Sequence, residues 1–380
     1  MTTSRRSILA GAAVTVTGAG VAAAAPAAAA PVVATPEVPL SAFVGLTDDD
    51  RLSDFMAWAA AQTMRGVTLV LDEARVYTFT RQQPLYSGFS IRGAGRPQDQ
   101  ARSSMPVAQR VDVRTPGGWF ALAQPQTFGV SIQGLSIDGS AGSRLVEGHP
   151  SYVLWTSVFR DISVQNAAGV LGSSLQPLLN TACCLDGWWN VNNVRDRAFN
   201  LGGSDTNVKP SEMLLDSPST LMPASGYLMS FESQSKGEIS GLYLTAEGHA
   251  GLSLSGGRGV RVLNNTIEGR NAGAPSPGAL VRITGGAWWF RDNALNFAMT
   301  DPAATGRDDR GVVHVAAGQV LLDGISYEKA NAASTTTPLV YVASGQVRIR
   351  NVFAEGFRPT VRQATEGLID ADDTVTVVTG

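Results

Sequence analysis

The sequence predicts an all-β protein, a single-stranded parallel β-helix (solenoid) with an N-terminal capping helix. A short motif recurs about every 27 residues, apolar residues alternate within each copy, and a segment with helical spacing precedes the first copies. Repeats of roughly 20–50 residues are typical of solenoids, in which each unit buries its apolar face only against its neighbours.

The repeated motif is clearest in the stretch 262–269, which reads Val-Leu-Asn-Asn-Thr-Ile-Glu-Gly. An apolar residue stands two positions before a turn-forming Gly, Asn or Asp, and an apolar and a polar residue stand three and four positions after it. Gly, Asn and Asp tolerate a left-handed or turn backbone, so the chain can bend there. The copies place turn-forming residues at Gly134, Asp161, Gly187, Asp216, Gly241, Asn264, Asp292, Gly324 and Asn351, with flanking copies at Gly93 and Gly380.

Each copy is expected to be a strand, because the positions two and four before the turn-forming residue are mostly apolar, as in Val260 and Val262. Stacked coils pair such strands at about 4.8 Å. The turn-forming residues should therefore lie in one line, since a slip of one residue would turn inward side chains outward. A β-sandwich is the alternative, but sandwiches do not repeat one register.

Residues 1–30 are expected to be an export signal. Arg5-Arg6 precedes an apolar Gly/Ala-rich run that ends in Ala28-Ala29-Ala30. The paired arginines favour a twin-arginine-type signal, which exports folded cargo, over an ordinary secretory one. The run is too weakly hydrophobic for a membrane anchor, so we expect a secreted protein without stable membrane insertion. Residues 31–47 have the composition of a Pro/Ala linker.

The β-helix domain is expected at residues 48–380, with the cap and first coil at 48–95. The segment 48–62 has apolar residues at helical spacing and aspartates at its positive end. Strands are expected at 67–71 and 76–79. Because an open solenoid end exposes apolar core and strand edges, the helix is the candidate cap.

This opening resembles that of pectate-lyase-like β-helix proteins. Asp49-Asp50, the helix, an apolar strand, the Val76-Tyr77 strand and the stretch 87–95 (Ser-Gly-Phe-Ser-Ile-Arg-Gly-Ala-Gly) carry the resemblance. The superfamily includes polygalacturonase-type hydrolases and many phage tailspike depolymerases. The resemblance implies a right-handed parallel β-helix and a carbohydrate substrate. It implies no particular activity, because function lies in the site and not in the fold.

Gly248-His249-Ala250-Gly251 resembles the Gly-His-Gly segment of polygalacturonases. That family also needs an Asn-x-Asp and an Asp-Asp pair one and two coils earlier, and this sequence has neither there. Asp308-Asp309 is such a pair but lies downstream. The sequence thus argues against the polygalacturonase mechanism, and His249 is expected in a surface loop.

A stripe of polar residues is expected four positions after the turn-forming residues. Glu328 and Glu355 should lie on adjacent coils, about 5 Å apart, and Glu268 and Glu328 two coils apart, about 10 Å. Carboxyl groups about 5–5.5 Å or 6.5–9.5 Å apart suit retaining or inverting glycoside hydrolysis, so these three glutamates are the candidate catalytic residues. The alternative is a solvated polar edge. The stripe reads Asp138, Gln165, Val191, Thr220, Thr245, Glu268, Asn296, Glu328 and Glu355.

Outward positions three and one before the turn-forming residues predict a substrate-binding patch. Guanidinium groups bind carboxylates through two hydrogen bonds, and an indole offers a flat apolar face to a sugar ring. The patch therefore suits an acidic polysaccharide, and its alternative is a ladder of ion pairs that uses Asp323 and Glu238. Its members are Arg261, Trp289, Arg291, Asp323, Arg348 and Arg350.

No cofactor or metal site is predicted, although the sequence leaves calcium binding open. The three histidines lack metal-ligand spacing, and Cys183 and Cys184 are adjacent, so we expect two free thiols, Cys183 inward and Cys184 outward. Without residues 1–30, and so without two arginines, the net charge changes from −3 to −5. A mildly acidic chain does not suit a nucleic-acid partner.

The repeat breaks at residues 200–225, which contain Gly202-Gly203 and three prolines, so a long loop or distorted coils are expected there. Further excursions are expected at 271–278 and 300–311. Loops of this kind commonly form the wall of a binding groove.

The sequence therefore predicts an exported protein that binds and degrades an extracellular, acidic polysaccharide. The carboxylate stripe favours hydrolysis, whereas the arginine patch favours a lyase, in which arginine neutralises the enolate-like charge. The alternative is a non-catalytic cell-surface or envelope protein that binds carbohydrate, and the missing polygalacturonase carboxylates support it. A phage tailspike is a third interpretation, but the export signal argues against it.

Overall fold

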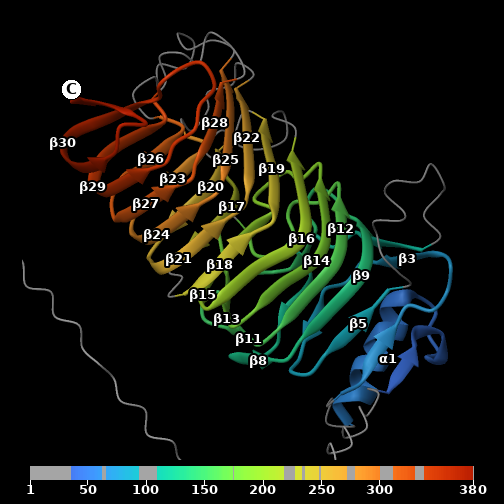
Figure 1. Ribbon diagram of the computed structural model, residues 1–380. Coiled ribbons are helices and arrows are strands. Elements are labelled where there is room, and N and C mark those ends of the chain that lie inside the picture. The colour runs from blue at the N-terminus through green and yellow to red at the C-terminus, as the bar shows by residue number, and fades with distance from the viewer. Residues whose placement is uncertain are drawn as a thin grey trace, which may run out of the picture. The chain divides into compact units, whose positions relative to one another are not determined.

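The structure, a computed structural model, is a stack of parallel β-coils with one α-helix at its N-terminal end (Figure 1). The fold belongs to the unit Thr35–Gly380. The predicted export signal, Thr220, His249, Asp308-Asp309 and Gly380 lie outside the described residues. The structure describes residues 36–61, 66–93, 109–173, 175–217, 227–232, 236–247, 250–271, 279–299, 311–329 and 338–379.

Each full coil contributes strands to three parallel sheets, which we call the pre-turn, post-turn and return sheets. Strands of the pre-turn sheet end at the line of turn-forming residues. They are β1 (Glu37–Pro39), β2 (Thr68–Val70), β5 (Ser90–Arg92), the first parts of β9 (Ser131–Asp138), β12 (Val158–Gln165), β14 (Cys184–Asn192) and β16 (Thr206–Ser217), then β18 (Gly237–Ser240), β21 (Gly257–Leu263), β24 (Gly286–Arg291), β27 (Gln319–Asp323), and the last parts of β29 (Val340–Arg350) and β30 (Thr360–Ala371).

The post-turn sheet begins where the chain has bent. Its strands are β3 (Val76–Phe79), β6 (Arg110–Val113), the last parts of β9, β12, β14 and β16, and then β19 (Leu242–Glu247), β22 (Thr266–Asn271), β25 (Ala294–Met299) and β28 (Ser326–Lys329).

The return sheet leads each coil back to the next pre-turn strand. Its strands are β8 (Gln126–Phe128), β11 (Val153–Trp155), β13 (Leu178–Thr181), β15 (Phe199–Ser204), β17 (Tyr227–Glu232), β20 (Ala250–Ser255), β23 (Val281–Ile283), β26 (Val313–Val315), the first parts of β29 and β30, and β31 (Thr376–Thr379). The remaining elements are the 3-10 helix η1 (Leu40–Ala42) and a small sheet of β4 (Gln83–Leu85), β7 (Gly118–Leu122) and β10 (Arg144–Val146).

The turn-forming residues stack in one line from Gly93 to Asn351, which confirms the predicted register over most of the chain. Their neighbours pair coil by coil, for example Arg92 with Gln133. The Asn and Asp members of the line adopt left-handed backbone, with φ between 52° and 54°. A bend with this geometry requires residues that tolerate positive φ, which is why the motif is visible in the sequence.

Three copies of the predicted register are wrong. Pro210, not Asp216, continues the line, because Gly187 pairs with Pro210 and Asp216 lies in the post-turn sheet opposite Thr245. A bulge after Gly187 puts Asn192 in the polar stripe and buries Val191. At the C-terminal end, Val378 pairs with Arg362 in the return sheet, so the predicted final copy there is also wrong.

Residues 200–217 form strands β15 and β16 rather than the expected loop or distorted coils. Gly202 and Gly203 pair with Leu179 and Asn180 on the preceding coil. A side chain at Gly203 would stand 2.0 Å from the carbonyl oxygen of Asn180, so the glycine reflects close backbone approach within a strand.

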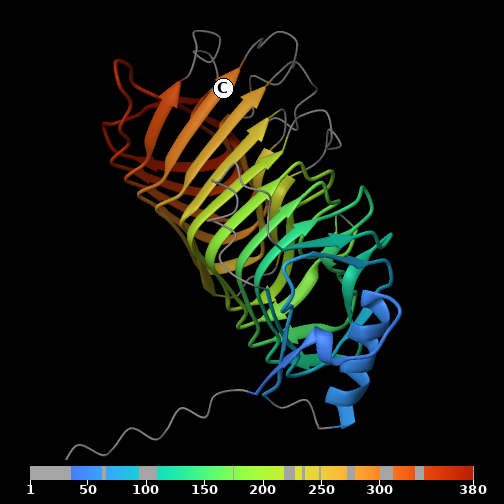
Figure 2. The same cartoon turned by 90° about the vertical axis from the view of Figure 1, so that its right-hand side faces the viewer.

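Helix α1 (Asp48–Ala61) lies beside the first coil at the N-terminal end of the stack (Figure 2). Its buried face carries Leu52, Phe55 and Met56. The ring of Phe55 packs against that of Phe89 at a centroid distance of 6.2 Å. The predicted helical cap is confirmed.

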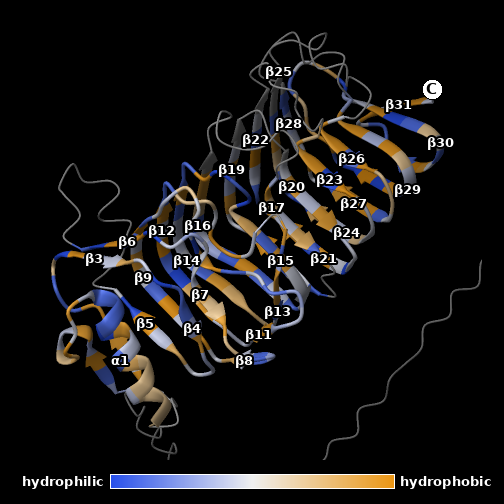
Figure 3. Cartoon of the chain, turned by 180° about the vertical axis from the view of Figure 1, so that it is seen from behind, coloured by the Kyte–Doolittle hydropathy of each residue, from blue (hydrophilic) through white to orange (hydrophobic). Residues whose placement is uncertain are grey.

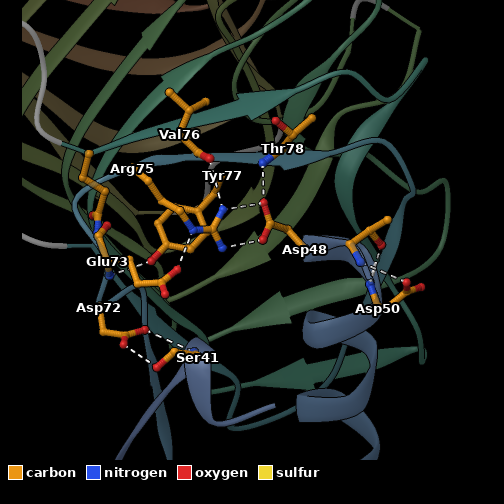
Figure 4. Close-up of polar contacts among 11 residues, drawn as sticks. Ser41, Asp48, Asp50, Asp72, Glu73, Arg75, Val76, Tyr77 and Thr78 are labelled. Carbon is orange, nitrogen blue, oxygen red and sulfur yellow. Dashed lines mark hydrogen bonds and ion pairs between the residues drawn. The ribbon is translucent and has the colours of Figure 1, made fainter. Parts of the chain in front are cut away.

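Aspartates at the start of α1 hold the helix to the first coil (Figure 4). Asp48 accepts hydrogen bonds from the Arg75 guanidinium at 2.6 and 3.0 Å and from the backbone N–H of Thr78 at 2.8 Å. Asp49 is buried and accepts from the backbone N–H and hydroxyl of Thr80 at 2.8 and 2.7 Å. The aspartates of the first turn therefore bind the helix to the first coil, and they also interact favourably with the helix dipole.

Inward side chains of the three sheets form one apolar core along the stack. Figure 3 shows the resulting alternation of hydrophobic and hydrophilic residues along the strands. Cys183 is buried and Cys184 is partly exposed, both as free thiols, as the sequence predicts. In the described part of the chain, no helix has the length and apolar character needed to cross a membrane.

Candidate functional site

The six predicted patch residues lie on the outer face of the pre-turn sheet, in two adjacent columns. Strand pairing stacks Arg261 on Trp289, Trp289 on Leu321, and Leu321 on Arg348. The second column stacks Arg291, Asp323 and Arg350. The structure therefore brings the predicted residues together as the register required.

A groove of about 450 Å³ runs over this face at the C-terminal coils. The indole of Trp289, which is 50% exposed, lies on one side of it. Gly259 on the neighbouring coil has φ 75°, and a Cβ atom there would stand 3.8 Å from the indole, in ordinary van der Waals contact. The groove is lined by Ala287, Trp289, Gln319, Val320, Leu321, Gln346, Val347, Arg348, Leu368, Ile369 and Asp370.

Two carboxylates pair with three of the four patch arginines, so they compensate the positive charge only in part. Arg348 and Arg350 both pair with Asp370, at 2.9 and 2.7 Å, and Arg261 pairs with Glu238 at 2.8 Å. The hydrogen bond from Arg350, together with that from Arg348, lowers the pKa of Asp370, so its carboxylate persists. The ion-pair alternative therefore holds for these residues.

The fourth arginine and the predicted acid of the ladder behave differently. Arg291 is exposed and lies 3.5 Å from Asp292, its own neighbour in sequence. Asp323 accepts a hydrogen bond from the side-chain amide of Asn351 at 2.7 Å instead of pairing with an arginine. Asp370, which lies beyond the last recognised copy of the motif, takes the role expected of Asp323.

The carboxylate stripe forms on the post-turn sheet, but only in part. Thr245, Glu268, Asn296 and Glu328 pair successively in β19, β22, β25 and β28, so Glu268 and Glu328 stand two coils apart, as predicted. On the next coil, Phe353 forms an isolated parallel β-bridge with Ser326 of β28. Glu355 follows in a turn. The expected strand pairing of Glu328 with Glu355 is therefore wrong, because the strand ends before it.

The two predicted sites occupy different faces of the solenoid. The line of turn-forming residues separates β21, β24 and β27, which carry the patch, from β22, β25 and β28, which carry the glutamates (Figure 1). A ligand lying in the Trp289 groove therefore contacts the pre-turn face, and the glutamates face another side of the coil.

The sequence analysis missed a third polar column, on the return sheet. Its members pair successively in β23, β26, β29 and β30. The recurring triplets Val-Arg-Ile, Val-His-Val, Val-Tyr-Val and Val-Arg-Gln could have revealed it, since an outward polar residue follows a buried valine in each. The column consists of Arg282, His314, Tyr341 and Arg362.

Within the described ranges, no group of three or more His, Cys, Asp or Glu side chains is arranged to hold a metal ion. Burial raises the pKa of the Cys183 thiol to about 11, so this group is a poor nucleophile.

The comparison with solved structures decides the fold family. DFA-IIIase from Arthrobacter chlorophenolicus A6 in complex with DFA-III aligns with a TM-score of 0.65 at 13% sequence identity, covering 90% of this chain and 96% of that chain. The fold is that of pectate-lyase-like parallel β-helix proteins. The same enzyme in complex with GF2 aligns with a TM-score of 0.61 at 13% identity over 90% and 96% of the two chains. The structure of this enzyme without its lid aligns with a TM-score of 0.65 at 12% identity, covering 91% of this chain and 98% of that chain.

These structural neighbours are carbohydrate-active enzymes, and two of the structures contain the carbohydrate ligands DFA-III and GF2. No protein-family model matches the sequence, and a search of curated proteins finds no match. At this identity the likeness shows the fold, and the activity has to be argued from the chain's own residues.

Proposed function

We propose that this protein binds a polysaccharide along the outer face of the pre-turn sheet and cleaves it with glutamates of the neighbouring post-turn sheet. The observation that carries the binding proposal is the half-exposed indole of Trp289 at the side of a groove. A large aromatic face that stays in solvent is suited to pack against the apolar face of a sugar ring. The side-chain amides of Gln319 and Gln346, 3.5 Å apart, supply donors and acceptors for hydroxyl groups.

The ion pairs of the groove favour a hydroxyl-rich chain over an acidic one. Asp370 binds both Arg348 and Arg350, so each of these guanidinium groups already has a carboxylate partner within the protein. A carboxylate of the ligand would have to compete with Asp370 for them. The acidic ligand predicted from the sequence is therefore not favoured at this groove.

For degradation, hydrolysis is the reaction we propose, with Glu268 and Glu328 as acid and base. Both are at least partly exposed on one face and stand two coils apart, about 10 Å by strand spacing. This backbone spacing leaves room for a water between two carboxyl groups, as inversion requires. Lyase elimination is less favoured, because three of the patch arginines are already paired with carboxylates of the protein.

The binding proposal is tested by replacing Trp289 with alanine and measuring affinity for a panel of neutral and acidic polysaccharides by affinity electrophoresis and calorimetry. We expect at least tenfold weaker binding to the glycan that the native protein prefers. Trp58→Ala is the matched control, since Trp58 is 38% exposed on α1, far from the groove. Unchanged binding in Trp289→Ala, with an unchanged melting temperature, would contradict the proposal.

The reaction is tested on the same panel by product analysis. New reducing ends without ultraviolet-absorbing unsaturated products indicate hydrolysis, and unsaturated products indicate a lyase. Glu268→Gln and Glu328→Gln should each lower the hydrolytic rate at least a hundredfold without weakening binding. Binding with no product on any glycan would favour the alternative, a non-catalytic surface protein.

We also propose that the protein acts outside the cytoplasm after twin-arginine-type export, which rests on Arg5-Arg6 and the Gly/Ala-rich run behind them. Replacing both arginines with lysine in a host with this pathway should leave the full-length chain inside the cell. Export that continues through the general secretory route would contradict the twin-arginine assignment.

A further inference from the structure

The last coil leaves part of one strand of the pre-turn sheet without a partner on its outer side. Strand β30 pairs with β29 on one edge, from Val361 to Ala371. On its other edge it pairs with β31 at Thr360–Gln363, and no described strand pairs with it at residues 366–371. We call this segment the open edge. It lies at the end of the stack farthest from α1 (Figure 1), and such an edge can accept another strand.

The hydrogen bonding of the preceding strand shows which backbone groups face the open side. Asp372 donates its backbone N–H to the carbonyl oxygen of Ile349 on β29 at 3.2 Å. Successive backbone groups of a strand point to opposite edges. The N–H and C=O groups of Gly367, Ile369 and Ala371 therefore face away from β29 and are available to a further strand.

The outward side chains of the open edge alternate between acidic and apolar. Leu368 is 59% exposed and lies between the exposed Glu366 and Asp370. Leu368 and Asp370 also line the groove beside Trp289. The carboxylate of Asp370 is shared by Arg348 and Arg350 of the preceding strand. The edge thus presents an apolar side chain next to a pair of guanidinium groups.

The C-terminal end of the stack is stepped, because its sheets stop at different coils. The post-turn side ends with the isolated bridge from Ser326 to Phe353, whereas the return sheet continues through β30 to β31. Exposed apolar residues lie on both levels, with Phe353 on the recessed side and Val377 and Val378 on the projecting strand. A two-fold rotation about an axis perpendicular to the pre-turn sheet exchanges these sides, so it sets each projecting strand against a recess.

We propose that the open edge pairs with the open edge of a second copy of this chain, in an antiparallel register centred on Leu368. Gly367 and Ile369 of opposite copies then exchange backbone N–H···O bonds, and Leu368 meets Leu368 of the second copy at the axis. A register centred on Ile369 would instead set Leu368 opposite Asp370, an apolar side chain against a charged one. Cross-strand pairs of like character stabilise a sheet, which favours the first register.

The charges of the open edge suit this pairing. Glu366 of the second copy stands opposite Asp370, on the side where Arg348 and Arg350 lie. Two acids directly opposite one another would repel. Because Arg348 and Arg350 share one carboxylate in the single copy, Glu366 of the second copy supplies another to this pair of guanidinium groups.

The N-terminal end of the stack is protected against the same kind of pairing. The first strand of the pre-turn sheet is β1, and Pro36 and Pro39 at its ends have no backbone N–H to donate. Helix α1 lies beside this end (Figure 2). A head-to-tail fibre would need that edge, so the association closes as a two-fold dimer. The two Trp289 grooves then lie end to end on one face, although the pairing does not depend on what they bind.

The first test measures the mass and length of the mature protein by light scattering and small-angle X-ray scattering. The native protein should be a dimer nearly twice as long as a single copy. Leu368→Asp places two carboxylates at the axis and should weaken association at least tenfold, whereas Trp289→Ala should remain dimeric. The matched control is Val158→Asp, since Val158 is exposed on β12, within the same sheet. A monomeric native protein, or equal dissociation in the two aspartate variants, would overturn the proposal.

The second test fixes the register by cross-linking. In Leu368→Cys the two introduced thiols face each other across the axis, where Cα atoms stand about 4.5 Å apart, within the range of a disulfide. Oxidation should join the two copies covalently. In Glu366→Cys the thiols stand four residues apart along the strands, about 13 Å, and should not join. The native protein, which keeps Cys183 and Cys184, gives the background. A dimer that Leu368→Cys does not cross-link would place the interface elsewhere and contradict the proposal.

Discussion

The side-chain nitrogen of Asn265 lies 2.9 Å from the side-chain oxygen of Asn293 on the next coil. The same oxygen accepts the backbone N–H of Asn265 at 3.0 Å, and the Asn293 amide donates to the carbonyl oxygens of Val262 and Arg291. Both asparagines are buried. This ladder satisfies backbone groups where the pre-turn sheet bends into the post-turn sheet, and so holds the two proposed faces in register.

Asn293→Ala should therefore destabilise the protein. The substitution removes the acceptor of the Asn265 backbone N–H and a donor to the Val262 carbonyl oxygen. Each buried group left unsatisfied costs about 1–3 kcal/mol. The urea concentration at the midpoint of unfolding, measured by circular dichroism, should fall clearly. Asn296→Ala, on the outer face of the following strand, serves as control and should change stability by less than about 0.5 kcal/mol.

Two adjacent residues of β21 test the register. Val262 is fully buried and Leu263 points outward, partly exposed. Val262→Asp places an unpaired charge in the core and should abolish folding of its coil, with a loss of more than about 4 kcal/mol. Leu263→Asp should be far milder. Similar melting temperatures for the two variants would mean that the strand register is incorrect.

Acid should loosen the helical cap through Asp48. Burial raises the pKa of this carboxyl, but hydrogen bonds from Arg75 and Thr78 outweigh burial and lower the pKa below 3.8. A carboxyl whose pKa is lower in the folded state stabilises the fold above its unfolded pKa and loses that contribution as the pH falls through the folded value. The native protein should thus lose stability below about pH 4.

The matching variant is Asp48→Asn, which has no carboxyl to protonate. Its unfolding free energy should be lower than that of the native protein at neutral pH, and should fall less steeply between about pH 5 and pH 3. Unfolding in urea at each pH provides the measurement. Parallel pH profiles of the two proteins would rule out this role of Asp48.

Asp370 is expected to suppress anion binding on the pre-turn sheet. Asp370→Asn leaves Arg348 and Arg350 without their shared carboxylate and should raise the affinity for polygalacturonate severalfold. Asp373→Asn, which removes an exposed acid a short way along the chain, is the control for net charge. Equal effects of the two asparagine substitutions would argue against a local role of the ion pairs.

The sequence by itself determined the coil repeat, the capping helix and the inward and outward residues of most strands. These features depend on local rules: a period of two for strands such as 257–263, and residues that tolerate positive φ at Asn264 and Asp292. Because the same rules repeat in each coil, the sequence alone predicts the two outward columns around Trp289.

Only the tertiary structure decided how the outward charges are compensated and where the register shifts. Asp370 comes from β30, outside the recognised motif, yet it pairs with both Arg348 and Arg350. Pro210 takes the place expected of Asp216, because bulges and loops add residues that no local pattern counts. Glu355 lies past the end of its strand, and the column from Arg282 to Arg362 arises from four coils at once. Which residues meet in such contacts depends on the number of residues in every coil between them. That number is a property of the whole fold and not of a local pattern.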